Sequence, residues 1–355
     1  PRRDGGFTIF YMGINLGSGS SIGGVGYVGE TYGWNRGVGM AGVGMLFGLV
    51  FFLWGQKFLD GRAEPPNEPE LKEKGFAIFN KENTIYLFGI LLVFMCWQLI
   101  QYQKILGYAL GTSGFVMLAL LIGYGFKKCD AAARGKLFVA SFLIATQSLF
   151  WALFEQQGAS LTLLADQQFN LHFMGMDWLP SQVQLMNAAF IVMFAPVLAW
   201  LWVAMAKKEI EPSTPAKFGI AMTLIGLGYM VFAYGMGIDE GSDKSFWWLV
   251  FIYFALTMAE LCLSPVGLSM VTKLSPKAIV GMVMGTWFLF TSLGNFVAGW
   301  ISSLTGSGSH GATAGALDVE ATMSVYNDIG LLSIGVGLVI FALTPLMRKH
   351  MHSVH

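Results

Sequence analysis

Two acidic residues stand inside long apolar stretches of the 355-residue chain. Glu155 lies in the run FWALFEQQ, and Glu260 lies in the run AELCLSP. A charged side chain at the centre of a membrane costs roughly 2.5–3.5 kcal/mol on insertion scales, so such residues usually face a bundle interior or a water-filled path. No lysine or arginine lies within the core of either stretch. The two carboxyl groups therefore predict a site that handles a proton or a cation.

Other polar and aromatic side chains accompany these acids at helical spacing. Three pairs of residues four positions apart share a helical face, namely Trp151 with Glu155, Glu260 with Ser264, and Trp287 with Thr291. Asn15 and Asn187 stand in further apolar stretches, where an amide needs hydrogen-bond partners from a neighbouring helix or a ligand. A lone buried asparagine or aromatic residue is more often a packing residue, whereas an unpaired carboxylate is costly to keep without a use.

The composition indicates a protein that is surrounded by lipid. Hydrophobic residues make up 55% of the chain and charged residues 12%, with a mean hydropathy of +0.60. Soluble domains carry about 25% charged residues. The formal net charge is zero, so no excess of positive charge favours nucleic acid. The three cysteines are odd in number and far apart, which predicts neither a disulfide nor a metal site.

A helix that crosses a bilayer needs about 20 largely apolar residues. The chain contains ten segments that meet this requirement. They are residues 5–28, 33–56, 84–103, 106–126, 136–165, 180–206, 216–238, 246–272, 278–304 and 322–347. The one long connection, residues 57–83, contains the run EPPNEPE, which predicts an extended polar linker. The fold class expected is an all-α membrane protein. Gly13-xxx-Gly17, Ser20-xxx-Gly24 and Gly44-xxx-Gly48 predict close contacts between helices.

The basic residues sort strongly between the two ends of these ten helices. Only Arg36, Lys104 and Lys244, out of 21 lysines and arginines, lie at one set of ends. Cytoplasmic loops are enriched in lysine and arginine, so the other set is expected in the cytoplasm together with both chain termini. Merging or dropping one helix would mix the two sets. The charge pattern therefore supports the count of ten and a multi-pass membrane protein.

Four short motifs resemble those of one transporter family. The run FYMGINLGS at residues 10–18 closely resembles the F-Y-x-x-I-N-x-G-S signature of the proton-dependent oligopeptide transporters, which belong to the major facilitator superfamily. Matches at residues 150–156 (FWALFEQ), 260–267 (ELCLSPVG) and 285–287 (GTW) follow in the order in which the family has them. The resemblance covers nearly the whole chain.

This resemblance implies two six-helix bundles around a central cavity, with an inserted helix pair between them. Residues 1–56 would be the last two helices of the N-terminal bundle, and residues 57–83 the cytoplasmic linker. Residues 84–133 would be the inserted pair, and residues 134–355 the complete C-terminal bundle. Fourteen helices are expected and ten are present, so four would precede Pro1. The family's acid-rich first-helix motif and its fourth-helix lysine are absent from this chain.

The resemblance also implies a function, which is the symport of di- and tripeptides with protons by alternating access. The fragment alone is expected to be inactive. Asn15, Asn187 and Glu260 match residues that hold the amino terminus of a peptide, and Glu155 matches an acid linked to proton coupling. The remaining substrate-site residues are expected to be Trp151, Trp287, Thr291, Ser264 and Tyr11. The expected partners are peptide, protons and membrane lipid, with no nucleic acid, cofactor or metal.

Other functions compete with this interpretation. A carrier of nitrate or another small solute would share the fold, but nitrate has no ammonium group for Glu260. A channel or a receptor-like bundle is an alternative from another class, although no repeated ring of pore-lining charges supports it. An enzyme is disfavoured, because the sequence contains no H-E-x-x-H, no G-x-S-x-G and no paired intramembrane aspartates.

Overall fold

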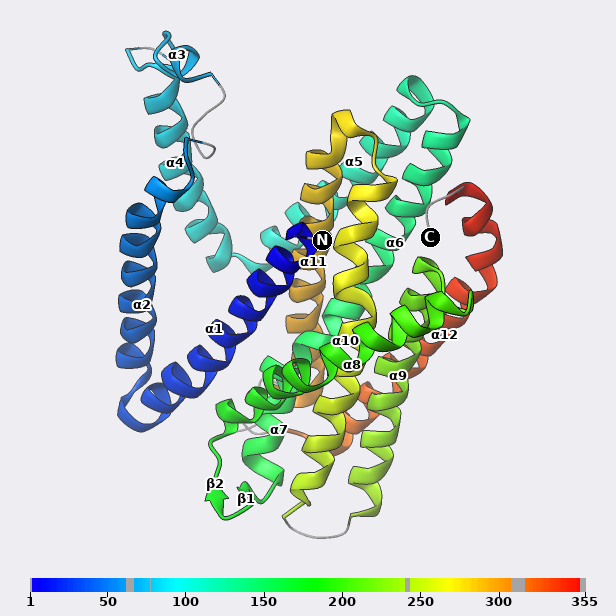
Figure 1. Ribbon diagram of the computed structural model, residues 1–355. Coiled ribbons are helices and arrows are strands. Elements are labelled where there is room, and N and C mark those ends of the chain that lie inside the picture. Colours follow the sequence, from blue (N-terminus) through cyan, green and yellow to red (C-terminus); the bar gives the residue numbers. More distant parts are fainter. Residues whose placement is uncertain (1, 62–66, 77, 240–242, 308–316, 352–355) are drawn as a thin grey trace.

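The computed structural model shows a protein that is almost entirely helical (Figure 1). It describes residues 2–61, 67–76, 78–239, 243–307 and 317–351, with side chains described from residue 13 onward. The long helices are α1 (Arg2–Tyr32), α2 (Trp34–Gly55), α4 (Lys81–Gln101), α5 (Gln103–Lys128), α6 (Ala131–Phe154), α8 (Leu185–Lys207), α9 (Thr214–Ile238), α10 (Phe246–Leu274), α11 (Val280–Ser302) and α12 (Val319–Met351). Shorter helices are α3 (Glu68–Leu71) and α7 (Ser160–Gln168).

The prediction of an all-α membrane protein is confirmed. Each predicted segment falls on a long helix, and within the described ranges nine helical stretches are long and apolar enough to cross a membrane. Helix α1 is not among these nine. It is 31 residues long, but its many glycines and serines lower its hydropathy. Among the described residues, the structure therefore has the ten long helices that the sequence predicts. Nine of the ten are apolar enough to be identified as membrane spans by hydropathy alone.

Two details of the prediction are wrong. The segment 136–165 is not one helix, because a 3₁₀ turn at Glu155–Gly158 separates α6 from α7. The linker is not wholly extended either, because Glu68–Leu71 form the helical turn α3. Proline at the second position of α3 fits the start of a helix, where its missing N–H would be unpaired in any case. The Glu64-Pro65-Pro66 part of the linker lies outside the described residues.

Short polar side chains begin several of the long helices. Asp130 Oδ1 accepts a hydrogen bond of 2.8 Å from the backbone N–H of Ala133 at the start of α6. Asn80 caps α4 in the same way through Asn83, also at 2.8 Å. Such caps satisfy backbone N–H groups that have no partner inside the helix. They set the entry points of α4 and α6 into the apolar region.

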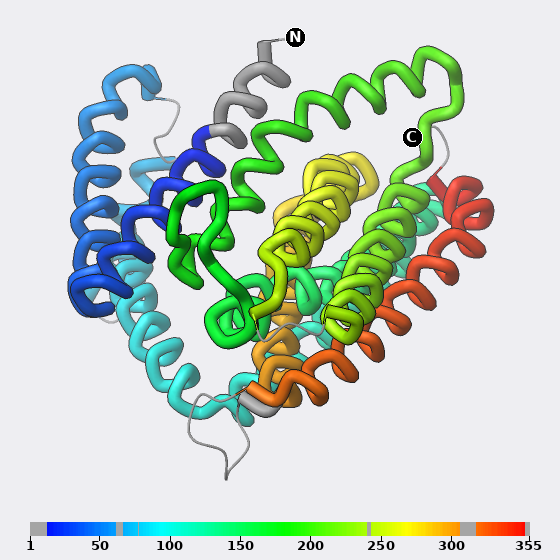
Figure 2. The backbone as a smooth tube through the Cα atoms, turned by 90° about the horizontal axis from the view of Figure 1, so that it is seen from below, coloured from blue at the N-terminus to red at the C-terminus, as the bar shows by residue number. Residues whose placement is uncertain are grey.

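The helices from α6 onward form a dense bundle, while α2 and α4 lie at the opposite side of the molecule from α9 and α12 (Figures 1 and 2). Helices α9 and α12 lie side by side, and small residues bring their backbones together. A Cβ atom on Gly226 would be 2.5 Å from the carbonyl oxygen of Gly330. Ser333 Oγ donates a hydrogen bond of 2.8 Å to the Met222 carbonyl across the same seam. Close backbone approach of this kind is how helices associate in lipid.

Helix α1 connects the N-terminal pair to this bundle by packing against α8 and the short 3₁₀ helix Pro180–Gln184 before it. Cβ atoms on Gly19 and Gly23 would lie 3.6 Å from Ala188 and 3.7 Å from Leu185. At the far end of this seam, the backbone N–H of Ser181 donates a hydrogen bond of 3.0 Å to Glu30 Oε1.

Two of the three small-residue pairs predicted to mediate helix contacts do not do so among the described residues. Cβ atoms on Gly13, Gly17, Gly44 and Gly48 would meet nothing within 4 Å. The close crossing of α1 and α2 instead uses other glycines of the same helices. A Cβ atom on Gly37 would lie 2.9 Å from the Cα atom of Gly29. The third predicted pair, Ser20 with Gly24, does lie at this crossing, because a Cβ atom on Gly24 would be 3.1 Å from the Met40 side chain. Spacing alone therefore identified the correct helices and one of the three contacts.

The connection between α7 and α8 carries a small hairpin of β1 (His172–Phe173) and β2 (Met176–Asp177). The strands are antiparallel, with His172 opposite Asp177. Phe173 stacks on Phe246 at the start of α10, with ring centroids 4.3 Å apart. The hairpin is thereby attached to the bundle near one end of α10.

The seam between α9 and α12 gives a direct test of packing. Replacing Gly226 with alanine places a methyl group against the Gly330 carbonyl oxygen, so we expect a destabilisation of about 1–3 kcal/mol from overpacking. The thermal unfolding midpoint of the purified full-length protein measures this. Gly237→Ala is the matched control, because it lies on the same helix and its Cβ atom would meet nothing within 4 Å. Equal midpoints for the two variants would contradict the close crossing.

Candidate functional site

Helices α8 and α10 meet at the carboxyl group of Glu260. Glu260 is 9% exposed, and Asn187 Nδ2 donates a hydrogen bond of 3.0 Å to its Oε2 atom. The same amide nitrogen donates to Thr257 Oγ1 at 2.9 Å, and the Thr257 hydroxyl donates to the Tyr253 carbonyl at 2.7 Å. In the part of the chain that the structure describes, no lysine or arginine forms an ion pair with Glu260. The carboxyl group is thus buried with a neutral amide as its partner.

Ser264 extends this polar face of α10 by one turn. Its Oγ atom is buried and makes no hydrogen bond with any other described residue. The next residue, Pro265, lies inside α10 and has no N–H to bond the carbonyl of Leu261. A bound molecule could therefore find an unused hydroxyl, and a carbonyl that lacks its usual helical donor, close to Glu260.

Glu155 lies at the interruption between α6 and α7. It ends α6 and begins the 3₁₀ turn, and its side chain is partly buried. Its neighbour Gln156 is fully buried and fixes the interruption in place. Gln156 Nε2 donates to the carbonyl of Ala152 and to that of Ala298 on α11, each at 3.0 Å. Ser160 donates to Gln156 Oε1 at 2.6 Å, so both groups of the amide are satisfied.

The interruption also contacts the helix that carries Glu260. The hydroxyl of Tyr253 on α10 donates a hydrogen bond of 3.1 Å to the Gln157 carbonyl. One turn further along α10, Thr257 holds the amide of Asn187. The structure therefore brings the two acids singled out in the sequence into one region.

A third group of residues joins α6 to α11 through a buried glutamine. Gln147 has no exposed surface, and its Oε1 atom accepts a hydrogen bond of 2.8 Å from the indole N–H of Trp151. Its Nε2 atom donates to the Trp287 carbonyl at 2.8 Å and to Thr291 Oγ1 at 3.4 Å. The hydroxyl of Thr291 in turn donates to the Trp287 carbonyl at 3.1 Å. One amide thus positions Trp151 relative to α11.

Trp151 and Trp287 differ in their exposure. Trp287 is 3% exposed, and its ring lies directly on α10, where a Cβ atom on Gly267 would be 2.1 Å from the indole. It also packs edge-on against Phe218, with centroids 6.3 Å apart. Trp151 is only partly buried. Of the two, Trp151 keeps accessible surface, while Trp287 is buried against α10.

The α1 residues of the predicted site lie across the seam with α8. Asn15 is partly buried and stands one turn before Gly19, which faces Ala188. Residues four apart share a helical face, so Asn15 lies on the α8-facing side of α1. Ala188 is the neighbour of Asn187. The side chain of Tyr11 lies outside the described residues, so its predicted role stays a prediction.

Three residues of this region were missed by sequence reasoning, although a signal for them existed. Gln147 lies four residues before Trp151, and Thr257 lies three residues before Glu260, so both share a helical face with a predicted site residue. Gln156 directly follows Glu155. No group of three histidine, cysteine or acidic side chains that could hold a metal ion occurs among the described residues.

The bridge formed by Gln147 leads to a second prediction. Leucine at this position keeps most of the volume but leaves the partly buried Trp151 N–H without its acceptor, which costs about 1–3 kcal/mol. We expect Gln147→Leu to lower the thermal unfolding midpoint of the full-length protein. Gln101→Leu is the control, because Gln101 is exposed at the end of α4. If both variants unfold at the wild-type temperature, the bridge does not stabilise the contact between α6 and α11.

The matches to known proteins cover the same helices. The sequence model of the POT family matches residues 1–316. The chain is 33% identical to the uncharacterized transporter YclF of Bacillus subtilis, over all of this chain and 69% of that protein. It is also 33% identical to the peptide transporter YePEPT of Yersinia enterocolitica, over 98% of this chain and 69% of that protein.

A similar structure has also been solved. A crystal structure of a mutant of the peptide transporter POT in complex with alafosfalin has a TM-score of 0.78 and 28% sequence identity. The match covers 99% of this chain and 69% of that one. The family model, the relatives and the shared helical arrangement all agree, and the chain belongs to the POT family of proton-dependent oligopeptide transporters, with the major facilitator superfamily fold.

Proposed function

We propose that the protein carries di- and tripeptides across the membrane together with protons, by alternating access. The observation that carries this proposal is the buried carboxyl group of Glu260, whose described side-chain partner is the neutral amide of Asn187. A buried carboxylate without a cation is unfavourable unless it takes up a proton or a cationic ligand. The ammonium group at the amino terminus of a peptide is such a ligand.

Glu260, Asn187 and Asn15 would surround this ammonium group. The amide nitrogen of Asn187 already donates two hydrogen bonds, which leaves its carbonyl oxygen to accept one. Glu260 supplies the charge, and a hydrogen bond between an ammonium and a carboxylate is among the stronger kinds. Asn15 would add a third polar group from α1, so that a bound peptide joins the two sides of the α1–α8 seam.

The rest of the peptide would lie against Trp151 and the polar groups near Ser264 and Thr291. Apolar walls with few polar groups accept varied side chains while they fix the orientation of the backbone. The relative YePEPT is described as a peptide transporter, which supports this substrate class. A small anion such as nitrate would give Glu260 no partner.

Glu155 would be the group that couples transport to protons. It stands at the interruption of α6, whose neighbours Gln156 and Gln157 are hydrogen-bonded to α11 and α10. A change of charge at this point can therefore act on two other helices of the bundle. If protonation and peptide binding favour the same conformation, each raises the affinity for the other.

We further propose that the basic helix ends and the C-terminus face the cytoplasm, in the inner membrane. The excess of lysine and arginine at these ends supports this orientation. The domain division predicted from the sequence would then place the linker 57–83 on the same side, between α1–α2 and the inserted pair α4–α5.

Replacing Glu155 with glutamine in the full-length protein tests the proton coupling. Glutamine keeps the size and polarity but cannot lose a proton, so we expect accumulation of peptide driven by a pH gradient to be abolished while counterflow exchange continues. Uptake of labelled dipeptide into proteoliposomes measures both. Glu320→Gln is the control, because Glu320 is exposed near the start of α12. Intact accumulation by the Glu155 variant would show that the coupling acid lies elsewhere.

Replacing Glu260 with glutamine tests how the peptide is held. A hydrogen bond to a charged group contributes about 1.5–3 kcal/mol, so the KM for a dipeptide with a free amino group should rise about 10- to 100-fold. An N-acetylated dipeptide has no ammonium group, and its transport should change little. Competition assays with the two peptides measure the difference. An equal loss for both would contradict a role of Glu260 in binding the amino terminus.

A further inference from the structure

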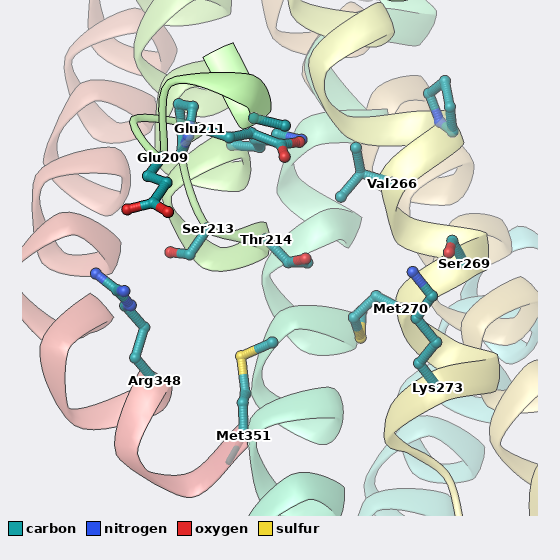
Figure 3. Close-up of a pocket in the computed structure, with 14 residues that line it drawn as sticks. Glu209, Glu211, Ser213, Thr214, Val266, Ser269, Met270, Lys273, Arg348 and Met351 are labelled. Atoms are coloured by element: carbon teal, nitrogen blue, oxygen red, sulfur yellow. The ribbon is translucent and has the colours of Figure 1, made fainter. Parts of the chain in front are cut away.

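A cavity of about 530 Å³ opens at the basic end of the bundle, beyond the region of the two acids (Figure 3). Its walls come from three places, which are the turn between α8 and α9, the second half of α10 from Pro265 to Lys273, and the end of α12. The peptide site proposed above ends one residue earlier on α10, at Ser264. The cavity therefore has no role in the function proposed so far.

The charges that line the cavity favour a ligand with one negative charge. Three cationic side chains, Lys217, Lys273 and Arg348, face two acidic ones, Glu209 and Glu211, which leaves a balance of one positive charge. Lys217 is 7% exposed and pairs with Glu211 at 2.5 Å.

The other cations have no such partner, because neither Lys273 nor Arg348 forms an ion pair with another described residue. Glu209 and Arg348 lie toward the same side of the opening (Figure 3). Lys273 and Arg348, which are both exposed, are therefore the cationic groups available to bind an anion.

The start of α9 adds hydrogen-bond donors on the wall opposite α10. Ser213 precedes α9, a helix of 25 residues, and its side chain makes no capping hydrogen bond. The Ser213 Oγ atom is buried and has no hydrogen-bond partner among the described residues. The first N–H groups of a helix and its dipole both favour an anion. The unused hydroxyl thus lies beside backbone groups that suit the same ligand.

The remaining walls are apolar, which favours a lipid over a free inorganic anion as the ligand. Val266, Met270 and Met351 line the cavity together with prolines 212 and 265. A free inorganic anion gains nothing from these side chains, whereas the glycerol and upper acyl chain of a lipid would bury them. Four further exposed lysines stand at the ends of the same helices or of the next one, namely Lys207, Lys208, Lys277 and Lys349. Clusters of this kind attract anionic lipid surfaces, and basic pockets between helices bind anionic head groups.

We propose that this cavity binds the phosphate head group of an anionic membrane lipid. A phosphodiester carries one negative charge, which matches the lining, and lies at the level of the membrane surface, where these helices end. Arg348 on α12 binds the phosphate together with the start of α9 and Ser213, which lie on the same side of the cavity, while Lys273 on the opposite wall adds to the positive potential of the site (Figure 3). Occupancy would join the ends of α9, α10 and α12 through one shared ligand.

The test compares lipid binding by the full-length protein with and without the two cations. Purified protein is titrated with phosphatidylglycerol or phosphatidylcholine, and bound lipid is counted by native mass spectrometry. Each lysine or arginine near an anionic head group contributes roughly a factor of five to affinity, so the double variant Lys273→Gln, Arg348→Gln should bind phosphatidylglycerol about 30-fold more weakly. Phosphatidylcholine binding should not change.

The double variant Arg36→Gln, Lys104→Gln is the matched control, because it removes the same charge from exposed positions at the opposite helix ends. It should bind phosphatidylglycerol as the wild type does. Ser269→Trp keeps every charge but fills the cavity from α10, and it should also lose the lipid. This variant decides the question if the charge variant does not fold.

Two results would overturn the proposal. One is equal loss of phosphatidylglycerol in the site variant and the control, which would mean that net charge alone attracts the lipid. The other is displacement of the lipid by millimolar inorganic phosphate, which would mean that the site takes a free anion. Both results leave peptide transport untouched, since neither concerns Glu155 or Glu260.

Discussion

The burial of the Glu260 carboxyl group, without a cationic partner among the residues that the structure describes, is the constraint on which the site depends. Glu260 is held by the amide of Asn187, and that amide is in turn fixed by Thr257. An amide can orient a carboxyl group but cannot neutralise it. A permanent ion pair with lysine would have made the site stable and inert. In the proposed function, this arrangement leaves the charge to be met by a proton or by a cationic cargo, which would make the buried acid a binding group.

The interruption of α6 has a related physical role. A continuous helix would satisfy its own backbone and would carry Glu155 as one more residue on its face. The 3₁₀ turn instead leaves carbonyl groups for partners on other helices, as the bond from Tyr253 to the Gln157 carbonyl shows. Gln156 then ties the turn to α11. The acid at this turn is coupled by hydrogen bonds to the helices that carry the other site residues.

The contact between α9 and α12 is closer than the contact between α1 and α8. The seam between α9 and α12 is made of glycines and a serine that bring two backbones together, which suits a bundle that moves as one body. The contact of α1 with α8 is a single seam of small residues, with a hydrogen bond between Ser181 and Glu30 at one end. A ligand held by Asn15 on one side and Asn187 on the other would lie across this seam.

The sequence by itself determined which segments are helices, which ends are basic, and which acids stand in apolar surroundings, because hydropathy and charge are properties of each stretch of chain. The family motifs likewise lie in short runs. Tertiary structure alone decided that Gln147 bridges Trp151 to α11, that Trp287 is buried, and that the helix of Glu155 is interrupted. Helical spacing shows which residues share a face, but which neighbour that face meets depends on contacts between residues more than a hundred positions apart.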